Sequence, residues 1–386
     1  MNNQLSIYIH IPFCEKKCSY CNFPSAAGEN ILFQPYFNAL QKEIITTAEI
    51  QNKLSGKINV TSVFFGGGTP SSVPVKFLLK TLETLHENYS INDDAEISVE
   101  CNPNSLTNKF ADLILEAGVN RFSLGVQSLD DNELVKLGRL HNSKKAETAY
   151  KLLRDAGAKN ISADLIYGIP EQTKESFKNN LKRIVEKWKP EHISIYSLSV
   201  EPGTPFDKWK KNKTKNWLWP DDDTVMNWFI YAEKYLSANL YPRYEISNFA
   251  KKGFESVHNT TYWDTTKNYI GFGAAAHSYC YLTADAGRKR FRNIKSIRKY
   301  IERINAKQKF RFFSRELTHK QKIGEKIYLG LRLARGVKIS SSEEKLFEKE
   351  IQQQINSGLI KRIQKNKIAL TKRGFQIANS VMAEFV

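Results

Sequence analysis

Residues 5–23 read LSIYIHIPFCEKKCSYCNF, an alternating apolar run that stops at Pro12 and is followed at once by three cysteines. Alternation of apolar and polar residues is typical of a β-strand. Cys14, Cys18 and Cys21 form a C-x3-C-x2-C pattern. Three thiolates on one short loop can hold three irons of a [4Fe–4S] cluster and leave the fourth iron open to an exchangeable ligand. The stretch therefore predicts a strand that carries a cluster loop.

Other uses of three close cysteines fit less well. A structural zinc ion takes four protein ligands, and no neighbouring His or Cys offers the fourth. A disulfide framework needs an even number of cysteines and a secreted chain. Three thiols packed as small apolar side chains are a further alternative. Cys101 and Cys280, each flanked by apolar residues, are predicted to be packed thiols without chemistry.

Length and composition favour two domains with large cores, because the chain has 386 residues, of which 41% are hydrophobic. Its first residues lack the basic and apolar regions of a signal peptide, and it has no apolar run of about 18 residues that would predict a transmembrane helix. Three of its five cysteines lie in the cluster motif, which fits a reducing compartment. We therefore expect a cytoplasmic protein.

The net charge of +18 falls entirely in residues 287–386, which hold 26 Lys and Arg against 8 Asp and Glu. Residues 1–286 hold 32 of each sign. Such asymmetry is typical of a chain with an anionic partner, which can be a nucleic acid, a membrane surface or an acidic ligand. A solvated basic surface without any partner is the alternative.

Strand-like apolar runs alternate with helical patterns as far as residue 202. This alternation predicts an α/β fold with six parallel strands joined by helical crossovers. After the first strand, the strand-like runs lie at 60–70, 96–103, 121–128, 160–170 and 192–202, and the helical patterns lie at 33–54, 77–85, 106–117, 134–137, 144–156 and 174–188.

The pattern changes after residue 202. Residues 203–317 read as a turn-rich connector or lid with one helix at 222–238 and then short extended pieces, among them 258–264. Residues 318–386 predict helices at 318–334, 342–356 and 373–385 and two short strands at 359–363 and 367–371, an order that resembles a winged helix. We therefore divide the chain at 1–202, 203–317 and 318–386.

Glycine and polar residues cluster where the predicted strands end. Gly66–Thr69 and Gln127 follow two of the strands, and Glu100 and Asp164 end apolar runs, where a charge is costly unless it is paired. Arg139 offers a planar guanidinium twelve residues after Gln127. In parallel sheets the carboxyl ends of the strands carry the sites. A tight turn and structural ion pairs are the alternatives.

These motifs together resemble the radical S-adenosylmethionine (SAM) superfamily. The resemblance implies a partial (β/α)6 barrel, in which the amino and carboxylate groups of SAM bind the open iron. It also implies that the glycine motif holds the SAM amino group, that Tyr20 meets the adenine, and that Glu100 accepts hydrogen bonds from the SAM hydroxyls. The implied SAM residues are Tyr8, Tyr20, Gly67, Gly68, Thr69, Glu100, Gln127, Arg139 and Asp164.

A closer resemblance covers nearly the whole chain. YIHIPFCEKKCSYCNF, FFGGGTP, LGVQS, DLIYGIP and GFGAAAHS are similar to motifs of the oxygen-independent coproporphyrinogen III dehydrogenase (HemN) family and its HemW branch. The HemW branch fits better because Phe23 stands where HemN has a fourth cysteine, because HemN has a longer segment before the cysteines, and because residues 258–263 match an H-N-x-x-Y-W signature of HemW. HemW proteins are heme chaperones, so the resemblance implies a heme chaperone.

The residue types in the motif at 258–263 also suit a heme site. His258 offers an axial nitrogen for heme iron, Tyr262 and Trp263 offer stacking surfaces, and the basic residues of the second half can meet the propionates. His10 and His277, near strand ends, are the next candidate ligands. A structural histidine with two core aromatics is the alternative.

The expected partners are heme and a heme-acceptor protein, with a membrane-associated respiratory enzyme as one candidate. A coproporphyrinogen dehydrogenase that decarboxylates propionate side chains by radical chemistry is the second hypothesis. A protein that binds or modifies nucleic acid through its basic winged-helix-like end is the third, although this end shows no recognition stripe and nucleic acid is the least expected partner.

Overall fold

Six parallel strands form the centre of the protein in the computed structural model, which describes residues 4–55, 58–282 and 288–386. They lie side by side in chain order, as the sequence predicts, and do not close into a complete barrel. Apolar side chains on the strands, such as Ile7, Val63 and Ile193, are fully buried. The six strands are β1 (Gln4–Ile11), β4 (Asn59–Gly67), β5 (Ser90–Cys101), β6 (Arg121–Gln127), β7 (Ile161–Tyr167) and β8 (His192–Ser197).

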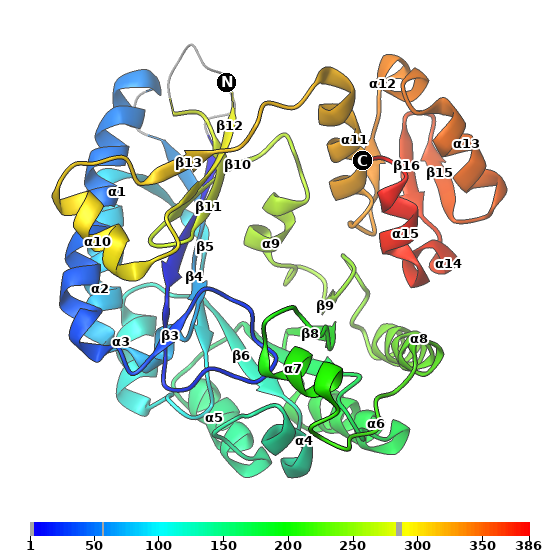
Figure 1. Cartoon of the computed structure of the whole chain (residues 1–386), viewed down its shortest axis with the longest axis horizontal. Helices are drawn as coiled ribbons and strands as arrows, with labels where there is room; N and C mark the ends of the chain where they lie inside the picture. The colour runs from blue at the N-terminus through cyan, green and yellow to red at the C-terminus, as the bar shows by residue number, and fades with distance from the viewer. Residues whose placement is uncertain (1–3, 56–57, 283–287) are drawn as a thin grey trace.

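Helical crossovers join these strands and cover the outer face of the sheet (Figure 1). Each helix buries its apolar stripe, for example Phe37, Leu40 and Ile44 of α1. The predicted helix at 174–188 is present, although its second half is wound as a π-helix over Arg183–Trp188. The crossover helices are α1 (Phe33–Ser55), α2 (Val75–Asn88), α3 (Asn108–Glu116), α4 (Asp131–Lys136), α5 (Ser143–Asp155) and α6 (Lys174–Lys182).

Strands from residues 248–313 extend the same sheet at both edges. β9 (Asn248–Ala250) pairs with β8, and β10 (Asn268–Phe272) pairs in parallel with β1. β11 (His277–Cys280), β12 (Lys289–Asn293) and β13 (Arg311–Phe313) continue the sheet as antiparallel strands. The division of the chain at residue 202 stays a prediction, because strands from both sides of it share one sheet.

A buried carboxylate ties this extension to the first crossover helix. Glu43 of α1 accepts hydrogen bonds from Tyr300 Oη (2.5 Å), Asn293 Nδ2 (2.8 Å) and Gly273 N (2.9 Å). Tyr300 belongs to α10 (Ile297–Asn305), which packs on α1. Figure 1 shows α1 and α10 on one side of β10–β13, with α9 and α11 on the other side.

The extended structure predicted for residues 258–264 is wrong. The segment forms a short helix, α9 (Val257–Tyr262), whose first residue follows the capping side chain of Ser256. The run of Thr, Tyr and Trp residues favours a strand. Tertiary contacts of the helix start, described below, override that preference. The connector before it also contains a helix, α7 (Pro205–Asn212), while α8 (Asp222–Ala238) agrees with the prediction.

The C-terminal residues build a second hydrophobic core around Ile327, Leu331, Ile351 and Met382. A three-stranded antiparallel sheet in the order β14-β16-β15 packs with its helices in the winged-helix-like arrangement that the sequence predicts. The two long helices predicted at 342–356 and 373–385 are each broken into two. The elements are α11 (His319–Gly330), β14 (Val337–Lys338), α12 (Ser341–Lys345), α13 (Glu348–Asn356), β15 (Ile360–Gln364), β16 (Lys367–Leu370), α14 (Lys372–Gln376) and α15 (Ala378–Ala383).

Within the described ranges, no helix has the length and apolar character needed to cross a membrane. Four short elements lie near the cysteines or the glycine turn: β2 (Phe13–Cys14), β3 (Ala26–Ala27) and the 3-10 helices η1 (Asn30–Leu32) and η2 (Pro70–Ser72).

Candidate functional site

One cavity of about 620 Å³ lies inside the curved sheet and reaches the cysteine loop. It brings together residues that the sequence analysis took from seven separate segments. Trp263, His10 and His277 do not line it. The predicted site residues that do line it are Tyr8, Cys14, Cys18, Tyr20, Cys21, Gly67, Gly68, Thr69, Glu100, Gln127, Arg139, Asp164, His258 and Tyr262.

The loop that carries the cysteines is fixed from two sides by backbone hydrogen bonds. Ser19 N donates to Leu137 O at the end of α4 (3.1 Å), and Phe206 N at the start of α7 donates to Ser19 O (3.2 Å). Tyr20 packs with Leu137 and Phe206 in a small apolar cluster. The three cysteines between these anchors are half-buried.

The donor set fits an iron–sulfur cluster better than a single metal ion. Among the described residues, no group of three or more His, Cys, Asp or Glu side chains converges on one ion position. Three thiolates of a [4Fe–4S] cluster bind three different irons and need not converge. Thr69 Oγ1 lies 3.6 Å from Cys14 Sγ, and Arg139 Nη1 lies 3.4 Å from Cys18 Sγ. Hydrogen bonds to the sulfurs are one means by which proteins tune such a cluster.

The glycine turn approaches the cysteine strand so closely that side chains are excluded. Gly68 N donates to Ile11 O (2.8 Å), and Thr69 N donates to Phe13 O (2.7 Å). A Cβ atom on Gly68 would lie 2.5 Å from Phe13 O, and Gly67 has a φ of +113°. The turn therefore needs glycine for both contact and conformation.

Two buried carboxyl groups face the cavity. Glu100 Oε2 accepts a hydrogen bond from Gly67 N (3.0 Å), and Asp164 accepts from Ser123 Oγ (2.5 Å) and Ser162 Oγ (2.7 Å). Burial raises the pKa of Glu100 to about 7, against the effect of the Gly67 N–H, and Asp164 adds to the rise. Burial also raises the pKa of Asp164. Burial therefore favours the protonated form of both groups, although Arg121 lowers the pKa of Asp164.

Arg139 and Gln127 hold strained or incompletely satisfied positions in the same wall. Arg139 Nη2 donates to Gly125 O (2.8 Å), but its buried Nε finds no hydrogen-bond partner within the described ranges. Gln127 has a φ of +66°, which is uncommon outside glycine and costs conformational energy. A bound group that accepts a hydrogen bond from Arg139 would satisfy the unpaired donor.

The sequence analysis missed a set of polar side chains deeper in the cavity. They lie at alternate positions of β6, β7 and β8, between apolar buried residues such as Phe122, Ala163 and Ile193. This period of two is the signal that would have found them, because alternate residues of a strand share one face. The missed cavity residues are Arg121, Ser123, Ser162, His192, Ser194 and Tyr196.

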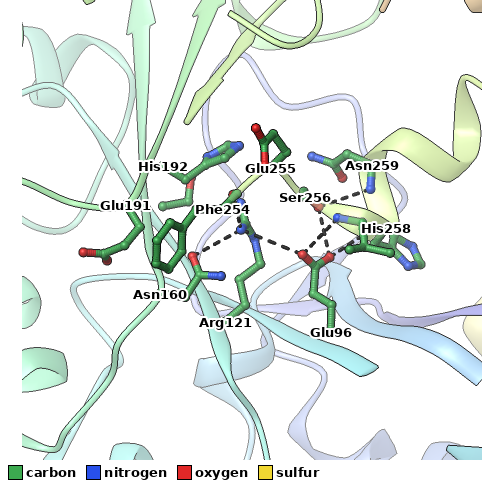
Figure 2. Close-up of polar contacts among 12 residues, drawn as sticks. Glu96, Arg121, Asn160, Glu191, His192, Phe254, Glu255, Ser256, His258 and Asn259 are labelled. Carbon is green, nitrogen blue, oxygen red and sulfur yellow. Dashed lines mark hydrogen bonds and ion pairs between the residues drawn. The ribbon is translucent and has the colours of Figure 1, made fainter. Parts of the chain in front are cut away.

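Figure 2 shows how a buried acid holds the start of α9 against the barrel. Glu96 of β5 accepts hydrogen bonds from Ser256 Oγ (3.1 Å), Val257 N (3.0 Å) and His258 N (2.9 Å). Arg121 Nη1 lies 3.8 Å from the same carboxylate and also donates to Phe254 O (3.0 Å). The Glu96 carboxylate satisfies free N–H groups of the helix start and therefore fixes α9 as a helix.

The candidate heme residues of α9 are arranged as a buried network. His258 is 1% exposed; its Nδ1 lies 3.0 Å from Ser62 Oγ and its Nε2 lies 2.8 Å from Tyr262 Oη. Burial lowers the pKa of His258 to about 3, so the ring is neutral. Trp263 lies under the guanidinium of Arg332, 4.1 Å from ring centroid to Cζ. As folded, both nitrogens of His258 are engaged within the protein.

Known protein families share the motifs that line this cavity. The sequence model of the radical SAM superfamily matches residues 8–184. The chain is 35% identical to the heme chaperone HemW of Bacillus subtilis over 99% of both chains. The chain belongs to the HemW family of radical SAM proteins.

Three further proteins are similar to this chain in sequence or in fold. The family member of Lactococcus lactis, also called heme chaperone HemW, is 33% identical over 99% of this chain and 97% of its own. A mitochondrial radical SAM domain-containing protein of Danio rerio is 33% identical over 86% of this chain and 74% of its own. The structure of coproporphyrinogen III oxidase (HemN) from Escherichia coli superposes with a TM-score of 0.82 at 23% identity, covering 99% of this chain and 89% of that one, which shows a shared fold.

Removing the Glu96 carboxylate should destabilise the protein strongly. Glu96→Ala leaves Arg121, which is 3% exposed, without its acidic partner and leaves the start of α9 without its acceptor. Breaking a buried pair in this way costs about 3–5 kcal/mol. Chemical denaturation should show this loss. The matched control Glu83→Ala breaks an exposed pair with Lys80 and should change stability little; an equal effect of both changes would refute the role of Glu96.

Glu100 should make stability depend on pH. Its carboxyl pKa is about 7 in the folded protein against 4.5 as the ordinary value, so the folded state keeps a proton that the unfolded chain releases. Stability is then lost as pH rises from 4.5 towards 7. In protein without cofactors, Glu100→Gln should equal wild type near pH 4.5 and exceed it at pH 8 by up to roughly 3 kcal/mol. Thermal or urea unfolding across this range measures the difference, and a gap that does not vary with pH would contradict the argument.

Proposed function

We propose that this protein is a heme chaperone that carries a [4Fe–4S] cluster on Cys14, Cys18 and Cys21, binds SAM beside it, and passes heme to an acceptor protein. The observation that carries the proposal is the similarity over 99% of the chain to a protein named as a heme chaperone. The cavity supports it, because three half-buried thiols and a glycine turn lie against one space of about 620 Å³.

Polar groups of the cavity that can still take a hydrogen-bond partner indicate where SAM would bind. A cluster bound here supplies an open iron and, when reduced, an electron. The carboxylate of SAM would satisfy the unpaired Nε of Arg139. Backbone carbonyl oxygens of the turn at Gly67 and Gly68 suit the SAM amino group as acceptors, and Glu100 suits the ribose hydroxyls as an acceptor. These roles are proposals for this chain.

The positive charge of the second half of the chain suits the binding of heme, which is an anion. Residues 287–386 carry the whole net charge of +18, and heme presents two carboxylates. His258, Tyr262 and Trp263 stay a predicted heme site, but His258 would have to give up one of its two hydrogen bonds before it bound iron. A membrane-associated respiratory enzyme stays one candidate for the acceptor.

The likeness to HemN does not transfer its activity to this chain, because at 23% identity it supports the fold alone. The position after Cys21 that would complete a C-x3-C-x2-C-x-C pattern holds Phe23, whose side chain is 60% exposed on the cysteine loop. Incubation with coproporphyrinogen under anaerobic, reducing conditions separates the two functions. A heme chaperone yields no decarboxylated product.

The cluster and its SAM site are tested together by spectroscopy. Anaerobic reconstitution of wild type should give a brown protein, and addition of SAM should change the EPR spectrum of the reduced cluster, because SAM binds the open iron directly. A variant with all three loop cysteines changed to Ala should stay colourless. The variant Cys280→Ala is the matched control, since Cys280 is buried in β11, does not line the cavity and should not alter the chromophore. Full iron and sulfide content in the triple variant would overturn the assignment.

Heme binding and transfer test the function itself. Titration of the reconstituted protein with hemin should produce a Soret band shifted from that of free hemin, which saturates, and mixing the loaded protein with an apo heme protein should give the band of the loaded acceptor. The reason is that a chaperone must hold heme in a form that an acceptor can take. A protein that gives no Soret band distinct from that of free hemin at any hemin concentration, with or without SAM, is not a heme chaperone.

A further inference from the structure

Most histidines of this protein are closed to an external ligand. His10, His192 and His258 are buried, and each uses both ring nitrogens in contacts within the chain. His141 is buried with one nitrogen on Val126 O. The remaining three of the seven histidines, His86, His277 and His319, are exposed. A heme that binds an imidazole without rearrangement of the protein must use one of these three.

His277 differs from the other two because it lies in a row across the sheet extension. His86 is on the outer helix α2, and His319 begins α11. His277 of β11 pairs in register with Arg292 of β12, and Arg292 pairs with Phe312 of β13. Residues directly opposite in antiparallel strands share a face with Cβ atoms about 4.5–5.5 Å apart. We call these three residues the sheet-face row.

The members of the sheet-face row have free binding capacity. Within the described ranges, the His277 side chain makes no hydrogen bond, and no acidic side chain lies within 4.0 Å of the Arg292 guanidinium. Arg292 stacks on the Phe312 ring, 5.4 Å from Cζ to centroid, and Phe312 is 39% exposed. The row therefore presents a cation, an exposed aromatic ring and an open imidazole side by side.

Neighbouring contacts connect the sheet-face row to the cavity of the cluster. Tyr279, two residues after His277, lies on the same face and packs on Tyr269 of β10. Tyr269 in turn packs edge-on against Tyr262 of α9, with ring centroids 4.8 Å apart. Tyr262 lines the cavity. The row therefore lies on the side of the sheet that faces α9 and α11, opposite α1 and α10 (Figure 1).

The charge around His277 is positive. Partial burial lowers the pKa of His277, and Arg292, Lys295 and Arg290 lower it further, so the ring is neutral at pH 7. Neutral imidazole is the form that binds iron. The same cations attract carboxylates, although Arg290 is already paired with Glu325 of α11.

We propose that heme binds on the sheet-face row, with the His277 imidazole as an iron ligand, the Arg292 guanidinium on a propionate and the Phe312 ring against the macrocycle. The proposal rests on the heme binding proposed above and deepens it by placing the site. No bond in the protein breaks and no electron is transferred, because the iron gains one nitrogen ligand only. In this arrangement His258 is a positioning residue, which holds Tyr262 at the boundary between row and cavity.

The iron ligand is tested with matched histidine variants of the reconstituted full-length protein. His277→Ala should shift the Soret band and weaken hemin binding about tenfold or more, by analogy with the loss of a metal-site interaction. His319→Ala, a change at another exposed histidine, should bind as wild type does. Free imidazole should restore the wild-type spectrum to His277→Gly, an effect that a merely structural role would not produce.

The carboxylate contact is tested by removing the charge from each partner in turn. Arg292→Gln should weaken hemin binding about tenfold, the order expected when a charged hydrogen bond is lost. It should leave binding of hemin dimethyl ester, which has no carboxylates, close to wild type. Equal losses for both porphyrins would show that Arg292 does not hold a propionate and would overturn this part of the placement.

The hemin-binding results distinguish failure of the sheet-face row from failure of the proposed function. If wild type binds no hemin, the proposed function fails. If wild type binds hemin while His277→Ala and Arg292→Gln bind it with unchanged affinity and spectrum, the function stands and the sheet-face row is refuted. Loss of the Soret band in His258→Ala alone, with His277→Ala unchanged, would likewise refute the row and return the ligand to α9.

Discussion

The close approach of the glycine turn to the cysteine strand is the constraint on which the site depends. Pairing of β1 with β4 runs to Ile11 opposite Gly67, and Gly68 N and Thr69 N then continue the backbone contacts past the strand ends. Because a Cβ atom has no room at Gly68, the turn lies directly against the loop that starts at Phe13. Thr69 thereby reaches Cys14, and Gly67 offers its N–H to Glu100. One backbone pairing thus places the cysteines, the turn and the acid around a common space.

Local patterns in the sequence were sufficient for the parts of the protein that are local in structure. The cysteine spacing, the parallel strands with their crossovers and the winged-helix-like end each depend on residues close together in the chain. Helix α9 was missed because the group that stabilises its start, Glu96, lies 162 residues before the His258 N–H that it accepts. The pairing of β10 with β1 was missed for the same reason, since no local pattern says which distant strand covers an edge.

In the candidate site too, the residues marked by a local pattern were predicted, and those that depend on distant contacts were not. Residues at strand ends stood out because charge or glycine interrupts an apolar run, and the structure brings them to one cavity. The serines of β6, β7 and β8 did not stand out, although their alternation was visible. The state of His258 was beyond sequence reasoning, because whether an imidazole is free depends on Ser62 and Tyr262, which bind its two nitrogens.

The position of β10 has a consequence for synthesis of the chain. β1 lies between β4 and β10, and β10 begins only at Asn268. At roughly 5–20 residues per second, about 200 residues separate the emergence of the two neighbours by on the order of ten seconds or more. During that time the edge of β1 next to the cysteine loop has unpaired N–H and C=O groups, and such edges invite pairing with other chains. Cotranslational folding therefore leaves the cysteine loop attached to an open strand until most of the chain has been made.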